Sequence, residues 1–563
     1  MTRKQPPWRR ASLAAAVTLA TLGGNPAAAV TFQLGEIDGQ LDSSLAVGAS
    51  WALRNPDPEQ LHGPASDDGK HNFKKGETFS KVFKGIHDLE LKYAESGLFL
   101  RGKYWYDFEL KDESRLFKDI DEHNRKEAAQ SSGAQLLDAF VYHNYQLGEL
   151  PGTTRLGKQV VSWGESTFIQ GGINSINPVD VAAFRRPGSE IKEGLIPVNM
   201  FYLSQNLSET LSVESFYQLE WDQTVIDNCG TFFSSSDVVA DGCGGLDTAL
   251  GVSLERAGDR DARDSGQWGA ALRWFAPELD SEFAAYFINN HSNQPYFSTI
   301  GATTPGDLAS ARYFIEYPED IRLYGLSFST MLASGTTLAG EISYRPNMPV
   351  QISPPDLVTA ASGSAALSPV LSSGAVQFGS GMDIHGYRRK EVTQAQVTAT
   401  HFFDQVMGAD RLTLVGEVGL VRVGGLEDRG DLRYGRPTVF GQGRLYPDNR
   451  LCTSLSNSAT PANCSDAGFV TRSAWGYRVR AIWEYSNLIP GVELRPNLAW
   501  SHDVDGYGAE PGFNEGAKAI SLGVDASLLS TYSASLSYTD FFGGDYNTNI
   551  DRDFVALSFG VAF

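Results

Sequence analysis

Long hydrophobic runs are almost absent from this sequence. Hydrophobic residues make up 42% of the 563-residue chain, and aromatic residues make up 11%. Even so, no stretch after residue 29 approaches the roughly 20 apolar residues that a helix needs to cross a bilayer. A membrane-spanning structure of this composition must therefore be built from strands whose backbone groups bond to one another.

Positive charge is scarce as well. The chain has 46 Lys and Arg residues against 67 Asp and Glu residues, which gives a formal net charge of -21. This charge argues against a nucleic-acid partner, whose phosphates would be repelled, and against the anionic cytoplasmic face of a membrane. Outer-membrane lipid remains a possible partner, because divalent cations can bridge acidic loops to anionic lipid.

The sequence has only four cysteines. They form two local pairs, Cys229 with Cys243 and Cys452 with Cys464, each inside a stretch rich in Gly, Ser, Asp and Asn. Two local disulfides in an oxidising compartment are the expected arrangement. A zinc site with four thiolates needs closer spacing within each pair, so we expect no bound metal.

The first 29 residues have the pattern of a secretory signal peptide. Basic residues precede the apolar run 11–22, and the small residues 27–29 mark a cleavage site after Ala29. The run is too short for a transmembrane anchor. The mature chain, 30–563, has no Pro/Ser-rich linker and no shift in composition, which favours one large closed domain.

Apolar and polar residues alternate along the mature chain over stretches of about ten positions. Between 97 and 110, for example, Tyr104 and Tyr106 lie on one face of an extended strand, and Lys103 lies on the other. The stretch 475–485 repeats this pattern. One face of each strand suits lipid and the other suits water.

The connections between these stretches alternate between short and long. Short turns are expected near 95–96, 148–152, 206–209, 277–281, 333–336, 404–410, 487–491 and 529–531. Long connections are expected near 54–80, 111–134, 164–197, 224–266, 290–319, 346–389, 422–469, 504–515 and 542–552. Tight periplasmic turns and long external loops are typical of bacterial outer-membrane barrels. A soluble β-sandwich has no reason to keep this order.

The predicted fold is therefore all-β: a transmembrane antiparallel up-and-down β-barrel of about 18 strands in the outer membrane of a Gram-negative bacterium. The chain also ends on an alternating strand whose last residue, Phe563, matches a familiar assembly signal of such barrels. Among the connections, 119–130 is charged and predicts a solvated external helix. The uncharged stretch 359–382 predicts a flexible external loop, or a lid that touches lipid or an apolar cargo.

Motifs for catalysis are not found. The nine histidines are scattered without an HExxH spacing, and no GxSxG elbow occurs. The aspartates near 259–264 lack the spacing of an EF-hand and are interpreted as solvated loop charges. We therefore expect no enzyme and no cofactor, while a lipid hydrolase stays open as an alternative, because a triad is defined by geometry.

The third long connection, 164–197, is rich in Gly, Asn, Pro and charges of both signs. In general porins the third loop folds inward and narrows the pore, so we predict the same here. The candidate residues for a constriction or for contact with cargo are Trp163, Glu165, Asn174, Asn177, Arg185, Arg186, Glu190 and Glu193. Arg185 and Arg186 are expected to pair with lumen carboxylates such as Glu214 or Glu417.

Charged residues are also predicted on the lumen face of the strands. They are Arg101, Lys103, Glu214, Glu417, Arg478, Arg480 and Arg495. These charges either pair with one another and with the inward segment, as in any polar barrel lumen, or form a charged ring that orients a passing solute.

Four stretches of the sequence resemble a family of bacterial outer-membrane proteins named domain of unknown function 1302. They are LGKQVVSWGES at 156–166, GGINSINPVD at 171–180, RPGSEIKEGLIPVN at 186–199 and FQLGEIDGQLDSSLAVGASW at 32–51. The resemblance covers essentially the whole mature chain. It implies a large barrel associated with a periplasmic partner protein and with inner-membrane transporters that handle lipid-like molecules.

The sequence thus predicts a channel or transporter for a small amphipathic or lipid-like solute, with an inward-folded third external loop. Two alternatives remain at this stage: a lipid hydrolase with its site at the rim, and a plugged structural or adhesion barrel.

Overall fold

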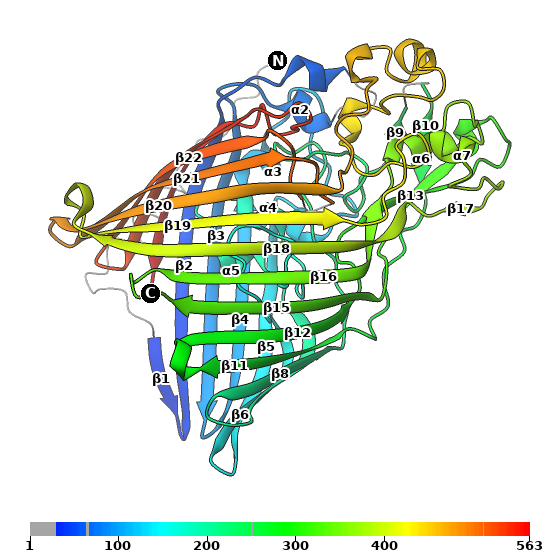
Figure 1. Ribbon diagram of the computed structural model, residues 1–563. Helices are drawn as coiled ribbons and strands as arrows, with labels where there is room; N and C mark the ends of the chain where they lie inside the picture. Colours follow the sequence, from blue (N-terminus) through cyan, green and yellow to red (C-terminus); the bar gives the residue numbers. More distant parts are fainter. Residues whose placement is uncertain (1–29, 63–66, 249–250, 510–511) are drawn as a thin grey trace.

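The structure is a computed structural model that describes residues 30–62, 67–248, 251–509 and 512–563. The predicted signal peptide, 1–29, lies outside the described residues. Within the described ranges, eighteen strands form one closed antiparallel barrel (Figure 1). They are β2 (Ile37–Ala52), β3 (Thr78–Tyr93), β4 (Ser96–Asp107), β5 (Ser132–Leu147), β6 (Leu150–Gln159), β7 (Val198–Asn206), β8 (Leu211–Gln218), β11 (Trp268–Ala276), β12 (Ser281–Asn290), β15 (Ile321–Met331), β16 (Thr337–Gln351), β18 (Tyr387–Asp404), β19 (Arg411–Val423), β20 (Ser473–Ile489), β21 (Val492–Asp505), β22 (Lys518–Leu528), β23 (Tyr532–Phe542) and β24 (Phe554–Ala562).

The barrel closes between its first and last strands. β24 pairs antiparallel with β2 from Ser44↔Ala562 to Ala52↔Phe554. At the end of this seam, Ser43 N–H donates to Phe563 O at 2.6 Å and Phe563 N–H donates to Ser43 O at 2.8 Å. The closed ladder satisfies the backbone groups that lipid cannot, and this confirms the predicted fold. A short strand, β1 (Val30–Leu34), forms a hairpin with the start of β2.

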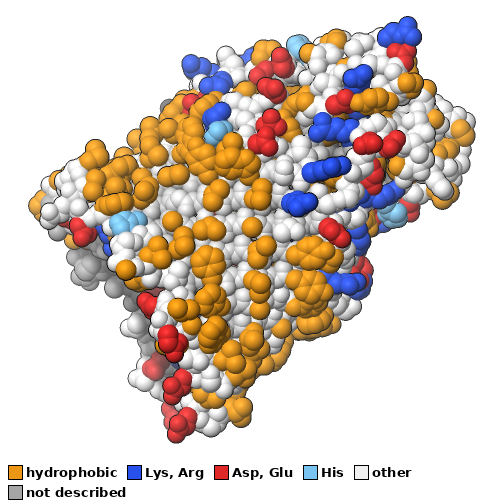
Figure 2. All heavy atoms as spheres, in the orientation of Figure 1, with side chains coloured by type: hydrophobic (Ala, Val, Ile, Leu, Met, Phe, Trp, Pro, Cys, Tyr) orange, Lys and Arg blue, Asp and Glu red, His pale blue; other side chains and the backbone are white. Residues whose placement is uncertain are grey.

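Side chains alternate across the barrel wall as the period-two pattern predicts. On β4, Lys103, Trp105 and Asp107 are buried on the lumen side, whereas Tyr104 and Tyr106 face outward and are half-buried. Figure 2 shows hydrophobic side chains spread over one outer face of the barrel, with charged side chains gathered toward its ends. The expected extended stretch 97–110 is, however, too long by three residues.

The chain leaves β4 early because Asp107 caps a helix. Its carboxylate accepts the N–H groups of Glu109 and Leu110 at 3.0 and 3.2 Å, so α3 (Phe108–Asp112) follows at once. The other short helices lie in connections as well: α2 (Asp68–Asn72), α4 (Val181–Arg185), α5 (Ile191–Gly194), α6 (Pro354–Ala361) and α7 (Pro369–Ser372). No helix of the described residues is long and apolar enough to span a membrane.

The predicted order of short and long connections is confirmed. Eight short turns join the pairs from β3–β4 to β22–β23, and they alternate with nine long connections. The long ones are 53–77, 108–131, 160–197, 219–267, 291–320, 352–386, 424–472, 506–517 and 543–553. Each lies within a few residues of its predicted place, because a strand must stop where the apolar alternation stops.

The long connections other than 160–197 assemble into a folded cap at one end of the barrel (Figure 1, where α6, β10 and β13 are labelled). A second sheet in the order β17-β13-β14-β10-β9 forms part of it. Its strands are β9 (Leu246–Asp247), β10 (Ser253–Arg256), β13 (Tyr296–Ile300), β14 (Arg312–Glu316) and β17 (Asp383–Ile384). Buried Leu254, Tyr313 and Leu357 belong to the hydrophobic core of this cap.

Two expectations for the external loops are wrong. The stretch 119–130 contains only one 3₁₀ turn, Glu127–Ala129. Its side chains bond elsewhere, because Glu122 pairs with Lys111 and Arg125 donates to Asn228. The stretch 359–382 is not a loose loop: the last three residues of α6 and all of α7 lie in it, and Ala360, Ala361 and Val370 are fully buried. Small uncharged residues there allow close packing on the cap sheet.

Candidate functional site

The connection 160–197, named here the inward segment, folds into the lumen and is fixed to opposite walls. Its first half reaches β19, the eighth strand from β6 in a ring of eighteen among the described strands. There Glu417 accepts three backbone N–H groups, from Thr167 at 2.9 Å and from Phe168 and Ile169 at 2.7 Å each. Glu417 is only 2% exposed, so these bonds are shielded from water.

A second pair of wall residues on β16 holds the same half. Glu341 accepts the N–H of Glu165 at 2.6 Å and that of Ile173 at 2.9 Å. Arg345 donates to the carbonyl oxygens of Gly171 at 2.7 Å and Gly172 at 2.6 Å. On this side, the segment contributes backbone N–H and C=O groups, and the wall contributes the charged side chains.

The second half of the inward segment reverses this arrangement on β3 and β4. Lys103 Nζ lies 2.7 Å from Asp180 Oδ2, and Lys84 Nζ lies 2.6 Å from Glu193 Oε1. All four side chains are buried. Here the wall is cationic and the segment carries the carboxylates.

The tip of the segment touches the barrel seam. A Cβ added to Gly48 on β2 would lie 2.8 Å from Pro187. A Cβ on Gly188 would lie 2.8 Å from Ser558 Oγ on β24, and Gly188 has a φ of +67°. Glycine at 188 is thus required both by the left-handed backbone and by the close approach to the wall.

The expected partners of Arg185 and Arg186 are wrong. Arg185 pairs with Asp227 in the connection 219–267 and donates to Phe233 O at 2.9 Å. Arg186 donates to Ala128 O at 3.0 Å, and its guanidinium lies 4.3 Å from the centre of the Trp105 ring. Arg185 ends α4 and Arg186 follows it, so both lie beside the cap connections, because Asp180 starts this helix on the β4 wall. Burial raises the pKa of Asp227, and Arg185 opposes that shift.

Trp163 and Glu214 form one buried unit. Trp163 is 1% exposed, and its indole N–H donates to Glu214 Oε2 at 2.7 Å. Tyr202 OH donates to the same oxygen at 2.9 Å, and Arg273 Nε donates to Glu214 Oε1 at 2.7 Å. Because Trp163 is enclosed, its role here is to anchor the start of the segment.

The remaining segment candidates have mixed surroundings. Asn177 links the two ends of the segment. Its side chain accepts Val161 N–H at 2.9 Å and donates to Gln159 O and Ile196 O. Asn174 is exposed and donates to Ser162 Oγ at 3.0 Å. The other two are Glu165, half-buried with a pKa raised by burial, and Glu190, exposed beside Lys192 at 3.2 Å.

Most of the predicted lumen cations are paired. Arg101 binds Asp88 at 2.7 and 2.9 Å and Asp138 at 3.1 Å, Arg478 binds Asp503 at 2.6 Å, and Arg495 binds Glu493 at 2.8 Å. Arg480 on β20 is exposed, and its side chain has no hydrogen bond or ion pair among the described residues.

Open space lies beside the segment tip. Two adjoining cavities, of about 250 and 300 Å³, share Gly188, Ser527 and Ser533 in their lining. The larger also touches Arg495 and Asp525. Ser558, Ser535 and Asp525 are register partners on one face of β24, β23 and β22, so these strands present small polar side chains to the lumen.

One family model matches residues 9–563 of the sequence, and its description is protein of unknown function, DUF1302. The chain belongs to this family. None of the curated proteins matches the sequence. Of the stretches that resemble this family, 156–166 begins the inward segment, 171–180 binds β16 and β4, and 186–199 packs on β2–β4.

Solved outer-membrane structures resemble this DUF1302 barrel at low identity. The outer membrane channel DcaP of Acinetobacter baumannii aligns with a TM-score of 0.36 and 9% identity, covering 94% of this chain and 99% of that chain. OccAB1 of Acinetobacter baumannii gives 0.41 and 10%, covering 93% and 96%. Pseudomonas aeruginosa OpdK, solved with vanillate, gives 0.39 and 10%, covering 93% and 98%. Likeness at this level says nothing about what the DUF1302 protein carries.

Several anchoring residues were not predicted from the sequence. They are Lys84, Asp180, Glu341 and Arg345. Lys84, Glu341 and Arg345 occupy lumen positions of the period-two pattern, so alternation could have placed them inside the barrel. Their partners lie 77 to 176 positions away in the chain, and the sequence contains no signal for such pairing.

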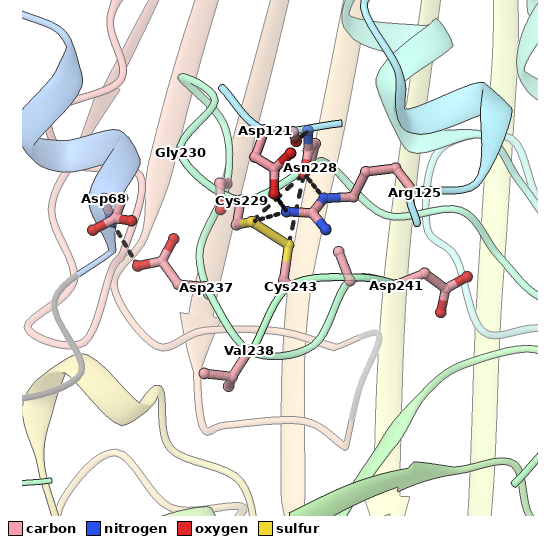
Figure 3. Close-up of a disulfide and its surroundings, with 12 residues drawn as sticks. Asp68, Asp121, Arg125, Asn228, Cys229, Gly230, Asp237, Val238, Asp241 and Cys243 are labelled. Carbon is pink, nitrogen blue, oxygen red and sulfur yellow. Dashed lines mark hydrogen bonds and ion pairs between the residues drawn. A yellow bond between two sulfur atoms is a disulfide. The ribbon is translucent and has the colours of Figure 1, made fainter. Parts of the chain in front are cut away.

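The four cysteines form the two predicted pairs, Cys229 with Cys243 and Cys452 with Cys464. Figure 3 shows the first, with Arg125 from the connection 108–131 reaching across to it. Arg125 Nε donates to Asn228 Oδ1 at 2.6 Å, and Nη2 lies 3.2 Å from Cys229 Sγ. The disulfide thus ties the connection 219–267 together beside its neighbour. In the part of the chain that the structure describes, no cluster of three or more His, Cys, Asp or Glu could hold a metal ion.

Proposed function

We propose that this protein is an outer-membrane channel that passes small amphipathic solutes between the inward segment and the wall formed by β21–β24. The observation that carries the proposal is the pair of cavities beside the segment tip, of about 250 and 300 Å³. The inward segment is bonded to β16 and β19 on another part of the wall, so we place the path on the side of these cavities. A fixed constriction beside an open path limits the size of the solutes that can pass.

The lining supports a solute of mixed polarity. Ser533, Ser535 and Ser558 supply hydroxyl groups without bulk, and Ala46 adds an apolar methyl group to the same lining. The pair Arg495–Glu493, which lines the larger cavity, places charge at one edge of the path. A solute with a polar end and an apolar body would meet partners for both.

A cysteine on the proposed path tests this directly. All four native cysteines are in disulfides, so Ser535→Cys adds one reactive thiol. In planar bilayers we expect a positively charged thiol reagent to reduce the single-channel conductance of this variant by half or more, since it adds bulk and fixed charge to the pore.

The matched control is Leu536→Cys, one residue away on the lipid face, 51% exposed and outside the lining of both cavities. The reagent should leave its conductance unchanged. The proposal is wrong if the folded wild-type barrel is electrically silent, as a plugged barrel would be, or if the reagent blocks both variants equally.

A further inference from the structure

A groove of about 400 Å³ lies on the outer wall of the barrel, over β12, β15, β16, β18 and β19. These strands cross the apolar face of the barrel (Figure 1, Figure 2). The groove forms because Gly340 and Ala395 are too small to fill the wall between exposed Leu326, Val397 and Leu420. Its lining is almost wholly apolar. In a membrane an acyl chain, and not water, must fill such a groove.

The next outward row of side chains toward the cap is polar. It runs across four paired strands through Tyr324, Tyr344, Thr393 and Arg422. Arg322 lies one outward position beyond Tyr324 on β15. The side chains of both arginines and both tyrosines are exposed, and none of these four side chains has a hydrogen bond or ion pair within the described ranges. Four free donors therefore lie on the cap side of the groove.

Positive charge at this border is not neutralised by the protein. Figure 2 shows basic side chains between the apolar face and the cap. Exposed Arg389 on β18 donates to the carbonyl oxygens of Asn347 at 3.1 Å and Glu319 at 2.6 Å, which carry no charge. Arg322 N–H donates to Asn347 Oδ1 at 3.0 Å, so both arginines contact the same residue. The outward face of β18 also carries Glu391, which forms no ion pair with any described residue.

This arrangement indicates a lipid with a phosphorylated head. Guanidinium groups bind phosphate through paired N–H donors, and the groove beside them suits an acyl chain. The strands of Arg322 and Arg422 are three spacings apart, about 14 Å across the sheet. One phosphate cannot reach both arginines, whereas a sugar-linked head with two phosphates can. The cap contains the long connections, so this end of the barrel faces the external leaflet.

We propose that this face binds one molecule of lipid A, the phosphorylated glycolipid of the outer leaflet. Its two phosphates bind Arg322 and Arg422, and one acyl chain lies in the groove over Ala395. Tyr324 and Tyr344 donate to the oxygens of the head between the two arginines. The groove is on the outside of the wall, so the site does not depend on the proposed channel function.

Native mass spectrometry of the full-length barrel in detergent micelles tests the binding. Lipid A with two phosphates is the probe, and phosphatidylglycerol and inorganic phosphate are the comparisons. We expect one lipid A molecule per barrel at low lipid concentration. Phosphatidylglycerol should bind about fivefold more weakly or worse, the factor expected for loss of one arginine contact at a charged membrane surface. Excess inorganic phosphate should not displace lipid A, because it cannot fill the groove.

Two charge variants locate the head of the lipid. Arg322→Gln and Arg422→Gln should each weaken lipid A binding about fivefold. The matched control is Arg411→Gln, on the same strand as Arg422 but at its opposite end, where Arg411 pairs with Glu484 at 2.7 Å. This control should bind lipid A as the wild type does.

A third variant tests the groove. Ala395→Phe adds bulk on the lipid face, where the barrel still folds, and should weaken lipid A binding at least as much as either charge variant. The matched control is Ala270→Phe, because Ala270 is an outward-facing, half-buried alanine on β11 outside the groove lining. It should leave the binding unchanged. Heat resistance on gels shows that each variant is folded.

Four results would each overturn the inference. Lipid A binding that survives Ala395→Phe and both charge variants would mean that the lipid only coats the barrel. Equal binding of phosphatidylglycerol, or displacement by inorganic phosphate, would reject lipid A as the occupant. Dimers that Ala395→Phe separates would show that a second copy of the chain covers the groove.

Discussion

Glu417 offers the most direct test of how the inward segment is held. Its carboxylate accepts the N–H groups of Thr167, Phe168 and Ile169 at 2.7 to 2.9 Å. In Glu417→Gln, one oxygen becomes an NH₂ group that faces a backbone donor, and the other loses its charge. One orphaned buried donor and two weakened bonds should cost about 3 to 5 kcal/mol of local stability.

Hydrogen exchange measured on the variant in nanodiscs gives the readout. Since 1.4 kcal/mol corresponds to about a factor of ten, amides of the peptide that contains 167–169 should exchange about a hundred- to a few thousand-fold faster. The control is Glu493→Gln, which breaks a half-exposed ion pair with Arg495. That pair is worth about 0 to 1 kcal/mol, and protection at 167–169 should not change. Unaltered exchange in a folded Glu417→Gln barrel would refute this account.

Two further predictions concern the cap. Burial and the neighbouring charge of Asp237 raise the pKa of Asp67 well above its usual range. The folded cap therefore holds a proton that the unfolded chain releases near pH 4, and cap stability should fall as the pH rises above about 4. Asp67→Asn, which mimics the protonated form, should make cleavage of the cap by an added protease slower at pH 7 and equal to wild type at pH 4. Separately, replacing Cys229 and Cys243 by Ser should destabilise the connection 219–267 by about 3 kcal/mol and speed its proteolysis roughly a hundredfold, while the heat resistance of the barrel on gels stays unchanged. Equal proteolysis of the reduced and oxidised loop would show that other contacts hold it.

The barrel could be predicted because its determinants are local. Within each strand, a few consecutive residues such as Lys103 and Tyr104 indicate which face meets lipid. The length of each connection indicates at which end of the barrel it lies. The cysteine pairs were predictable for the same reason, since each spans a short loop. The pairing of the first strand with the last one, which precedes Phe563, followed from the up-and-down order alone.

The contacts of the inward segment could not be predicted, because they join positions far apart in the chain. Nothing near Arg185 indicates that Asp227 will lie beside it, or that Glu417 will bind backbone groups instead. The cap sheet shows the same limitation: β9 has two residues and β10 has four. Strands this short carry no readable periodicity, and β10 pairs on one side with β14, which comes from another connection.

The charge pattern around the inward segment argues for a fixed constriction and against a moving gate. On β3 and β4 the wall carries the cations Lys84 and Lys103, and the segment carries the carboxylates. On β16 and β19 the wall carries Glu341 and Glu417, and the segment presents N–H groups. Displacing the segment would break both sets together and leave charges without partners in the lumen, each at a cost of several kcal/mol. In the proposed channel, selection of solutes then depends on the shape of the path beside the segment.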